Sequence, residues 1–259
     1  MRWPQYLPVN LFYAQFMLGH LLWHMELNMI NVLVYNHFAG VMDRYGLQLY
    51  DPMPYISGST LTVREFRGKS NSDIIWTDSR AMLAWNATRA AWGKPIYVGY
   101  AFRRIGEGGH SNQSQHYTGM AFDVAQNLSN ASRNQLRDLA SRLGVWSYVE
   151  PAYLTPTWVH FDARLAPPAC SAGYTMVRQG SKGVYVATLQ DALGTVGIPA
   201  VGIDGIFGPN TRNAVTTFQR ENGLAADGIV GCQTWTKLTS MANGKLRGIT
   251  NIPSTYINE

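Results

Sequence analysis

The chain has 259 residues, of which 46% are hydrophobic and 14% are charged, so it has enough apolar material for one large globular domain or two smaller ones. Its formal net charge is +5 without a dense run of lysine and arginine, which excludes the basic footprint of a nucleic-acid-binding protein. This mild basicity suits an ordinary solvated surface as well as a polyanionic polymer.

Residues 1–42 are interpreted as an uncertain N-terminal extension. The stretch 11–34 is rich in apolar residues, but polar residues such as His20 and Glu26 interrupt it too often for a membrane span. It also lacks the basic start and the small-residue cleavage site of a signal peptide. Three interpretations are open: a poor anchor or export segment, a helical segment packed on the next domain, or sequence upstream of a start at Met42. The last two are favoured.

Residues 43–166 have the pattern of a mixed domain. Two amphipathic segments predict helices, the first capped by Asp78 and stopped at Gly93, and short apolar segments predict strands. We therefore expect an α+β domain with a small, mainly antiparallel sheet and flanking helices. The expected elements are a loop with a short strand at 57–67, helices at 78–92 and 132–143, and strands at 96–100, 120–124, 146–150 and 158–164.

A short Pro-rich linker at 167–176 precedes a segment, 177–240, with an internal near-repeat. An Asp-Gly turn at Asp204 is echoed 23 residues later at Asp227, and each copy leads into a helix start. The pattern predicts a compact three-helix unit and resembles the bacterial peptidoglycan-binding domain found on wall hydrolases. We expect this module to fold alone, and its removal to leave chemistry elsewhere intact. Residues 241–259 are interpreted as an irregular tail.

The stretch with the most chemistry is Ser114-x-His116-x-x-Gly119-x-Ala121-x-Asp123. Imidazole nitrogen and carboxylate oxygen are ordinary ligands of Zn²⁺, and three protein ligands leave a fourth position for water, as a catalytic zinc site requires. Gly119 permits an unusual backbone angle or a close approach, and Ala121 leaves room beside a metal.

A second motif, Trp-x-His-x-Asp at 158–162, follows the first. In this order the two motifs resemble the zinc D-Ala-D-Ala carboxypeptidase family, whose members, with their endopeptidase relatives, cut peptide bonds in bacterial peptidoglycan. The resemblance covers about residues 43–166. It implies that His116, Asp123 and His160 are the Zn²⁺ ligands.

The resemblance is incomplete at the general base. Many members carry an acidic residue three positions before the last histidine ligand, where this chain has Thr157. Of the two nearby carboxylates, Glu150 is ranked ahead as the base because it precedes a proline-bounded loop that can turn it toward the metal. Asp162 follows His160 by two positions on a predicted strand, so it faces the same way and is ranked as a partner that orients a ligand. Each can equally be a surface or structural carboxylate.

Three further residues are candidates for substrate contacts. Arg103 lies where the family often has an arginine, and its guanidinium is expected to hold the substrate C-terminus or to stabilise the oxyanion, with Arg104 as the alternative. Ser114 is expected to be structural or to face substrate, and no serine-centred elbow makes it a nucleophile. His110 can line the cleft, although loop histidines usually have no special role.

The two cysteines, Cys170 and Cys232, form no Cys-x-x-Cys pair and are not a metal-site signature. Cys170 lies in the linker and Cys232 in the C-terminal module. We expect free thiols.

The leading interpretation is a zinc peptidase that hydrolyses peptidoglycan stem peptides or cross-links and is held on the wall by its C-terminal module. Such an enzyme would act at the cell wall or outside the cell, or as a phage-encoded lysin. We expect Zn²⁺ as cofactor, peptidoglycan as partner, a monomer, and neither nucleic-acid binding nor stable membrane insertion. Two alternatives stay open: a wall-binding protein whose peptidase domain has lost catalysis, which Thr157 motivates, and a metallopeptidase for other substrates. The position of the bond cut is also open.

Overall fold

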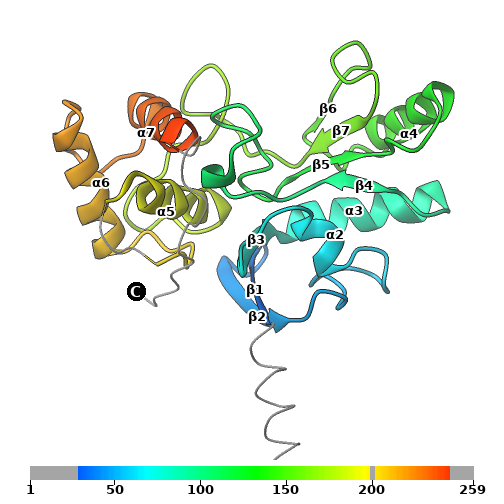
Figure 1. Cartoon of the computed structure of the whole chain (residues 1–259), viewed down its shortest axis with the longest axis horizontal. Helices are drawn as coiled ribbons and strands as arrows, with labels where there is room; N and C mark the ends of the chain where they lie inside the picture. The colour runs from blue at the N-terminus through cyan, green and yellow to red at the C-terminus, as the bar shows by residue number, and fades with distance from the viewer. Residues whose placement is uncertain (1–28, 199–201, 246–259) are drawn as a thin grey trace, which may run out of the picture.

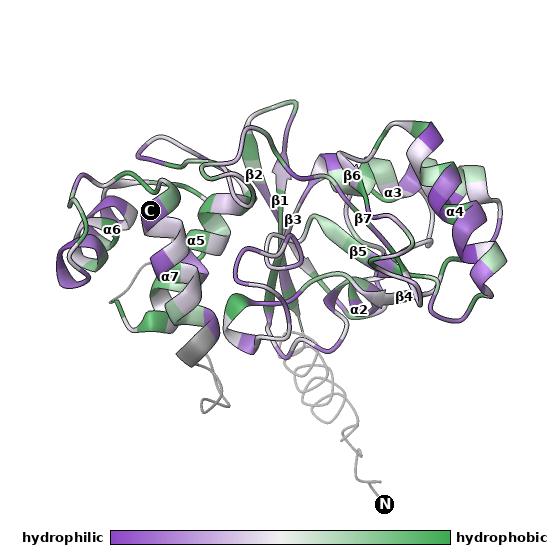
Figure 2. Cartoon of the chain, turned by 90° about the horizontal axis from the view of Figure 1, so that it is seen from above, coloured by the Kyte–Doolittle hydropathy of each residue, from purple (hydrophilic) through white to green (hydrophobic). Residues whose placement is uncertain are grey.

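The computed structural model describes residues 29–198 and 202–245 (Figure 1). These ranges contain six α-helices and seven strands in two small sheets, so the mixed α+β class is as predicted, although two sheets replace the single expected one. The two sheets and their helices occupy one side of the molecule, and three C-terminal helices occupy the other (Figures 1 and 2).

The first sheet has the order β2-β1-β3, with β1 (Ile30–Asn36) antiparallel to β2 (Val41–Leu47) and parallel to β3 (Ile74–Asp78). Val32, Leu33 and Val34 on its central strand are buried. Residues 30–42 therefore belong to the folded domain, and their assignment to an extension, or to sequence upstream of a start, is wrong. A buried central strand needs only a short apolar run, much shorter than the apolar stretch that a membrane span requires. Residues 1–28 of the expected extension lie outside the described residues.

The helices begin and end at residues that the sequence marks. The short helix α2 (Val63–Arg67) replaces the strand expected at 57–67, because Thr62 and Glu65 form a reciprocal capping box that starts a helix. The helix α3 (Ser79–Trp92) is capped by Asp78 and ends at Gly93. The helix α4 (Asn130–Leu143) is capped by Ser129 and ends at Gly144.

The second sheet is antiparallel throughout and has the order β4-β5-β7-β6. Its strands are β4 (Val98–Tyr100), β5 (Ala121–Val124), β6 (Tyr148–Val149) and β7 (Val159–Asp162). On one face, Phe122 and Phe161 stack on Trp85 and Trp146, with ring centroids 5.0 and 4.3 Å apart. Because successive side chains alternate, this packing leaves Asp123 and His160 on the opposite face.

The C-terminal module consists of α5 (Val184–Val196), α6 (Pro209–Glu221) and α7 (Cys232–Lys245). The near-repeat reappears as two equivalent hydrogen-bond networks. The Gln190 side-chain amide donates to the Asp204 carboxylate at 2.8 Å and to the Thr211 hydroxyl at 3.2 Å. In the second copy the Gln219 side-chain amide makes the same two contacts, to the Asp227 carboxylate at 3.0 Å and to the Thr234 hydroxyl at 3.1 Å.

Helix α7 also corrects one boundary. It extends to Lys245, so residues 241–245 are helical and do not belong to an irregular tail. Residues 246–259 lie outside the described residues.

Cys170 and Cys232 form a disulfide with their Cα atoms 4.9 Å apart, so the expectation of free thiols is wrong. The linker therefore contacts the start of α7. The two cysteines are 62 residues apart in the sequence, so no local pattern indicates that they pair. A disulfide suits an oxidising compartment. Among the described helices, none combines the length and the apolar character that crossing a bilayer requires.

Candidate metal centre

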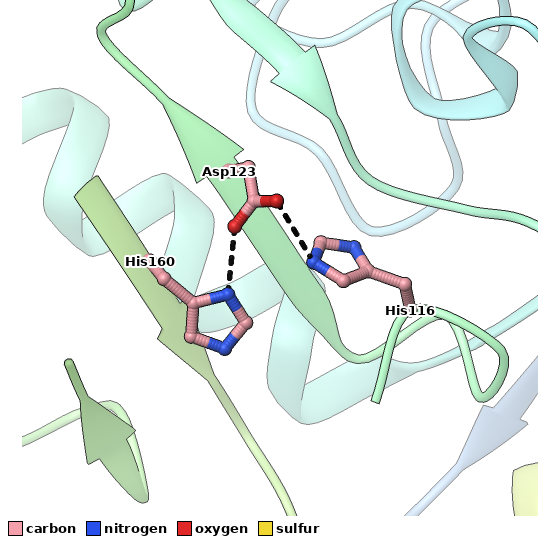
Figure 3. A group of neighbouring side chains, drawn as sticks. All are labelled: His116, Asp123 and His160. Carbon is pink, nitrogen blue, oxygen red and sulfur yellow. Dashed lines mark hydrogen bonds and ion pairs between the residues drawn. The ribbon is translucent and has the colours of Figure 1, made fainter. Parts of the chain in front are cut away.

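The structure brings His116, Asp123 and His160 together, with one ligand atom of each lying within 4.8 Å of the others (Figure 3). His116 lies in the turn before β5, Asp123 lies on β5, and His160 lies directly opposite Asp123 on β7. The two carboxylate oxygens of Asp123 face different rings. Oδ2 is 3.2 Å from Nε2 of His116, and Oδ1 is 2.7 Å from Nδ1 of His160.

Local backbone chemistry fixes the turn that carries His116. The Ser114 hydroxyl accepts a hydrogen bond from the backbone N–H of His116 at 3.3 Å, so Ser114 stabilises the turn, as its structural interpretation requires. Gly119 has a φ of +68°, and a Cβ atom there would lie 1.8 Å from the backbone oxygen of Trp76. The glycine of the motif is therefore required by both backbone angle and space.

Hydrogen bonds select which ring nitrogen of each histidine can bind a cation. Nδ1 of His116 lies 2.8 Å from the backbone oxygen of Ala101, which accepts its proton, so Nε2, 3.2 Å from Asp123, is the nitrogen that would bind a cation. Nε2 of His160 lies 3.2 Å from Asp162, which accepts its proton, so Nδ1, 2.7 Å from Asp123, is the nitrogen that would bind a cation after losing its own proton. Two ring nitrogens and one carboxylate, with each histidine held by an acceptor behind it, fit a Zn²⁺ ion.

The hydrogen bonds between Asp123 and the two histidines shift the pKa values of Asp123 and His160. Burial alone would raise the pKa of Asp123, but hydrogen bonds from His116 and His160 hold it well below its usual range. Burial alone would lower the pKa of His160, but its hydrogen bonds to Asp123 and Asp162 raise it to about 9. The metal-free site therefore holds a proton that a cation must displace.

Asp162 is fully buried, and both of its oxygens are engaged. Oδ1 accepts hydrogen bonds from the backbone N–H of Arg164 at 3.0 Å and from its guanidinium at 2.7 Å, and Oδ2 contacts the same guanidinium and His160. Burial alone would raise the pKa of Asp162, but the hydrogen bonds from Arg164 and His160 lower it. A carboxylate held in this way is suited to orient His160 rather than to accept a proton during turnover.

Glu150 lies on the same side of the sheet as His160. It continues the register of β6 against β7, and its backbone N–H donates to the backbone oxygen of His160 at 2.9 Å. Residues directly opposite each other in an antiparallel pair point to the same face. Glu150 is also close enough to Tyr148, on this face, to raise the pKa of its hydroxyl, an effect second to that of burial. Thr157 is exposed on the loop before β7.

The two neighbouring arginines have different surroundings. The guanidinium of Arg103 lies 4.8 Å from the centre of the Tyr100 ring, and its Nε has no hydrogen-bond partner among the described residues. The guanidinium of Arg104 is buried against Asp191 of α5, 2.6 Å from its carboxylate. Arg104 is therefore not the substrate-binding alternative, because its donors are committed to a structural ion pair.

His110 lies closer to the centre than its loop position indicated. Its ring stacks on His116 with centroids 4.4 Å apart, and its Nε2 is buried without a hydrogen-bond partner among the described residues. Burial, followed by repulsion from His116, lowers the pKa of His110 to about 3, so the ring is neutral at ordinary pH. The sequence spacing between His110 and the motif does not predict the contact with His116, because that contact depends on how the intervening loop folds.

The C-terminal module is similar to a known domain family. Residues 182–238 match the family described as "Putative peptidoglycan binding domain". The chain contains a member of this domain family. The match covers α5, α6 and the first half of α7, and it agrees with the near-repeat on which the sequence resemblance rested.

Three relatives are similar over segments of 64 to 82 residues. The N-acetylmuramoyl-L-alanine amidase CwlL of Bacillus licheniformis is 40% identical over 80 residues, 29% of this chain and 22% of the amidase. The zinc D-Ala-D-Ala carboxypeptidase of Streptomyces albus G is 47% identical over 64 residues, 23% of this chain and 24% of the carboxypeptidase. An uncharacterized protein of Kitasatospora aureofaciens is 40% identical over 82 residues, 30% of this chain and 70% of that protein. The chain thus spans less than a quarter of each of the two wall hydrolases.

Proposed function

We propose that the chain is a zinc-dependent peptidase that hydrolyses peptide bonds in bacterial peptidoglycan. The observation that carries the proposal is the arrangement of His116, Asp123 and His160, in which each histidine turns one ring nitrogen toward the carboxylate and is held from behind by an acceptor. Peptidoglycan as substrate is supported by the wall-binding domain and by the two relatives named as wall hydrolases.

A bound Zn²⁺ would polarise the scissile carbonyl and lower the pKa of a water molecule toward neutrality. The residues around it have separate roles. His116, Asp123 and His160 would hold the ion, and Asp162 holds the ring of His160 in the orientation that turns Nδ1 toward it. Glu150, on the same face of the sheet, accepts the proton from the attacking water.

Arg103 is the substrate-binding group in this proposal. Its guanidinium rests on Tyr100, an aromatic ring that also contacts the ring of His116 with centroids 5.6 Å apart. The Nε of Arg103 is buried without a hydrogen-bond partner among the described residues, and in this proposal the guanidinium donates to a substrate carboxylate or to a developing oxyanion. Ser114 serves the site through the turn it stabilises, and direct contact with substrate is a further part of the proposal.

The second candidate is a wall-binding protein without catalysis, and the exposed Thr157 at the position of the usual acid favours it. The site opposes this candidate, because a protein without turnover would not require Asp162 and the backbone oxygen of Ala101 to hold two histidines in register. The disulfide and the wall-binding domain suit action at the cell wall for either candidate.

Digestion of purified sacculi, followed by mass spectrometry of the muropeptides, tests the proposal. Loss of a terminal D-Ala identifies a carboxypeptidase, and cleavage within a stem or a cross-link identifies an endopeptidase. The zinc content of the purified protein is measured on the same sample. Binding to sacculi with bound zinc, but without new muropeptides, would favour the non-catalytic candidate.

A further inference from the structure

One hydroxyl group of the C-terminal module touches both segments that carry the histidines of the metal centre. The hydroxyl of Tyr185, on α5, accepts a hydrogen bond from the backbone N–H of Leu165 at 3.1 Å and donates to the side chain of Gln115, also at 3.1 Å. Gln115 immediately precedes His116, and Leu165 follows His160 by five residues. Tyr185 is only 3% exposed, so these bonds lie inside the protein.

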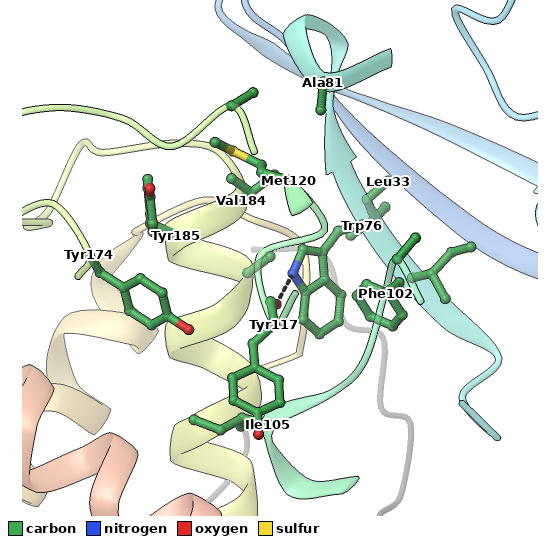
Figure 4. Packing of buried hydrophobic residues seen from close by; sticks show 14 of the residues in the cluster. Leu33, Trp76, Ala81, Phe102, Ile105, Tyr117, Met120, Tyr174, Val184 and Tyr185 are labelled. Atoms are coloured by element: carbon green, nitrogen blue, oxygen red, sulfur yellow. Dashed lines mark hydrogen bonds between the residues drawn. The ribbon is translucent and has the colours of Figure 1, made fainter. Parts of the chain in front are cut away.

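A second residue of the same helix holds the turn after His116. The Thr188 hydroxyl lies 3.0 Å from the backbone oxygen of Tyr117 and 2.8 Å from that of Val184, so its proton is shared between them, and the indole N–H of Trp76 donates to the Tyr117 oxygen at 2.9 Å. Tyr117 therefore lies between the first sheet and α5, as Figure 4 shows. The side chains of Trp76, Tyr117 and Thr188 are buried. The contacts to the Tyr117 backbone oxygen tie the position of this turn to the position of α5.

The linker adds a third attachment to the same turn. Tyr174, which is completely buried, donates from its hydroxyl to the backbone oxygen of Ser114 at 2.8 Å. Its backbone N–H donates to the Gln113 side chain at 3.0 Å. The ring of Tyr174 in turn packs on Tyr185, with centroids 5.3 Å apart. The segment from Gln113 to Tyr117 is thus held from the module side at several consecutive residues.

The remaining anchor is the buried ion pair between Arg104 and Asp191. The carboxylate of Asp191 accepts hydrogen bonds from the Arg104 guanidinium at 2.6 and 2.8 Å and from the backbone N–H of Ile105 at 3.0 Å. The preceding residue, Arg103, donates its backbone N–H to the backbone oxygen of His116 at 3.2 Å. Movement of α5 would therefore shift the segment that carries the proposed substrate-binding arginine as well.

Ordinary packing between domains does not account for this pattern. A phenylalanine would supply the same apolar ring as Tyr185 at an interface, without the need to satisfy a buried hydroxyl. The polar contacts described here converge on the stretches that begin or end at the metal centre, and they come from one helix and the linker before it. A plain tether would require no contact with these stretches.

We infer that helix α5 of the peptidoglycan-binding module is a positioning element of the metal centre, and that Tyr185 is its central positioning residue. The inference rests on the proposed function, since it concerns how the metal centre is held. It replaces the expectation, drawn from the sequence, that the module acts only as a tether. The module completes the fold of the site, so wall binding and hydrolysis take place in a fixed relative geometry.

The test substitutes Tyr185→Phe in the full chain, which removes one hydroxyl and keeps the ring. Zinc affinity is measured by competition with a chelator, and kcat and KM are measured on a soluble stem peptide. We expect zinc affinity or kcat to fall about fivefold, the scale of one lost internal hydrogen bond, with KM and binding to sacculi unchanged. A second pair, Thr188→Val and Thr188→Ser, repeats the test, and the serine variant should recover the loss.

The control is Phe218→Leu, a buried substitution on α6, a helix that lies on the far side of α5 from the metal centre (Figures 1 and 2). It should lower the melting temperature and leave zinc affinity and kcat unchanged well below that temperature. Wild-type zinc affinity and kcat in both Tyr185→Phe and Thr188→Val would overturn the inference. If the wild type cleaves no muropeptide, the proposed function fails separately, and the zinc affinities of the same variants still decide the positioning role.

Discussion

Nε2 of His160 lies 3.2 Å from the Oδ2 atom of Asp162, which is fully buried and held in turn by the guanidinium of Arg164. This contact fixes the ring so that Nδ1 faces Asp123. Asp162 thus acts on the centre through His160, without contributing a ligand atom to the cluster of three.

Asp162→Asn is expected to weaken zinc affinity about 10- to 100-fold, because an amide no longer supports the charge and tautomer of His160. Chelator competition measures the change, and circular dichroism checks the fold. Arg164→Gln serves as the matched control. It removes the ion pair between Arg164 and Asp162 but keeps the contact between Asp162 and His160, so it should lower zinc affinity less than Asp162→Asn does. Equal zinc affinity in Asp162→Asn and wild type would contradict the role.

Glu150→Gln should retain zinc and lose turnover by about 100-fold or more, because the amide cannot accept a proton from water. The measurement is kcat on a soluble stem peptide alongside zinc content. Thr157→Ala is the control at the position where the resemblance expected an acid, and it should behave as wild type because its side chain is exposed. If Glu150→Gln is nearly normal and Asp162→Asn retains zinc but is inactive, the two carboxylates have exchanged roles.

His116→Ala, Asp123→Ala and His160→Ala should each abolish bound zinc and activity, since two remaining ligands hold the ion poorly. A strong chelator should inactivate the wild type, and added Zn²⁺ should restore it. Full activity in the presence of the chelator would remove the basis of the proposed mechanism.

Much of the centre could be predicted because its signals are local. The spacing of His116, Gly119 and Asp123 is a property of a few consecutive residues, and the alternation of a strand places His160 and Asp162 on one face. Arg103 and Arg104 could not be told apart, because only the distant Asp191 distinguishes them.

The contacts that could not be predicted join residues far apart in the chain. The strand β1 was missed because its apolar run is short and follows a stretch with polar interruptions. The pairing of Cys170 with Cys232, and the hydroxyl of Tyr185 on Gln115 and Leu165, depend on how the linker and α5 fold back. Such contacts leave no periodicity or motif in the sequence.

Zinc affinity should rise with pH up to about 9. In the metal-free protein, hydrogen bonds to Asp123 and Asp162 outweigh the effect of burial and raise the pKa of His160 to about 9, so the ring is protonated at neutral pH. Zinc must displace that proton, and affinity should therefore change about tenfold per pH unit below 9. Chelator competition between pH 6.5 and 8.5 measures the slope, and a flat profile would contradict it.

The same shift affects the stability of the metal-free protein in the opposite direction. A histidine whose pKa is raised on folding contributes stability that is fully present below its unfolded pKa of about 6.5. That contribution is lost as the pH rises through about 9. The metal-free protein should therefore become less stable between pH 7 and 9 while the zinc-bound protein does not, and denaturant titrations with and without zinc compare the two.

Gly119→Ala should destabilise the protein far more than Gly144→Ala. Both residues have a positive φ, +68° and +63°, so both alanine variants incur the same backbone cost of about 1 kcal/mol. Only at Gly119 would the new Cβ atom meet the backbone oxygen of Trp76, at 1.8 Å, whereas nothing lies within 4 Å at Gly144. We expect a loss of about 3 kcal/mol or more at Gly119, together with weaker zinc binding, because the turn that holds His116 must move. Denaturant unfolding of the two variants measures the difference, and equal losses would mean that the turn can relax without disturbing the metal centre.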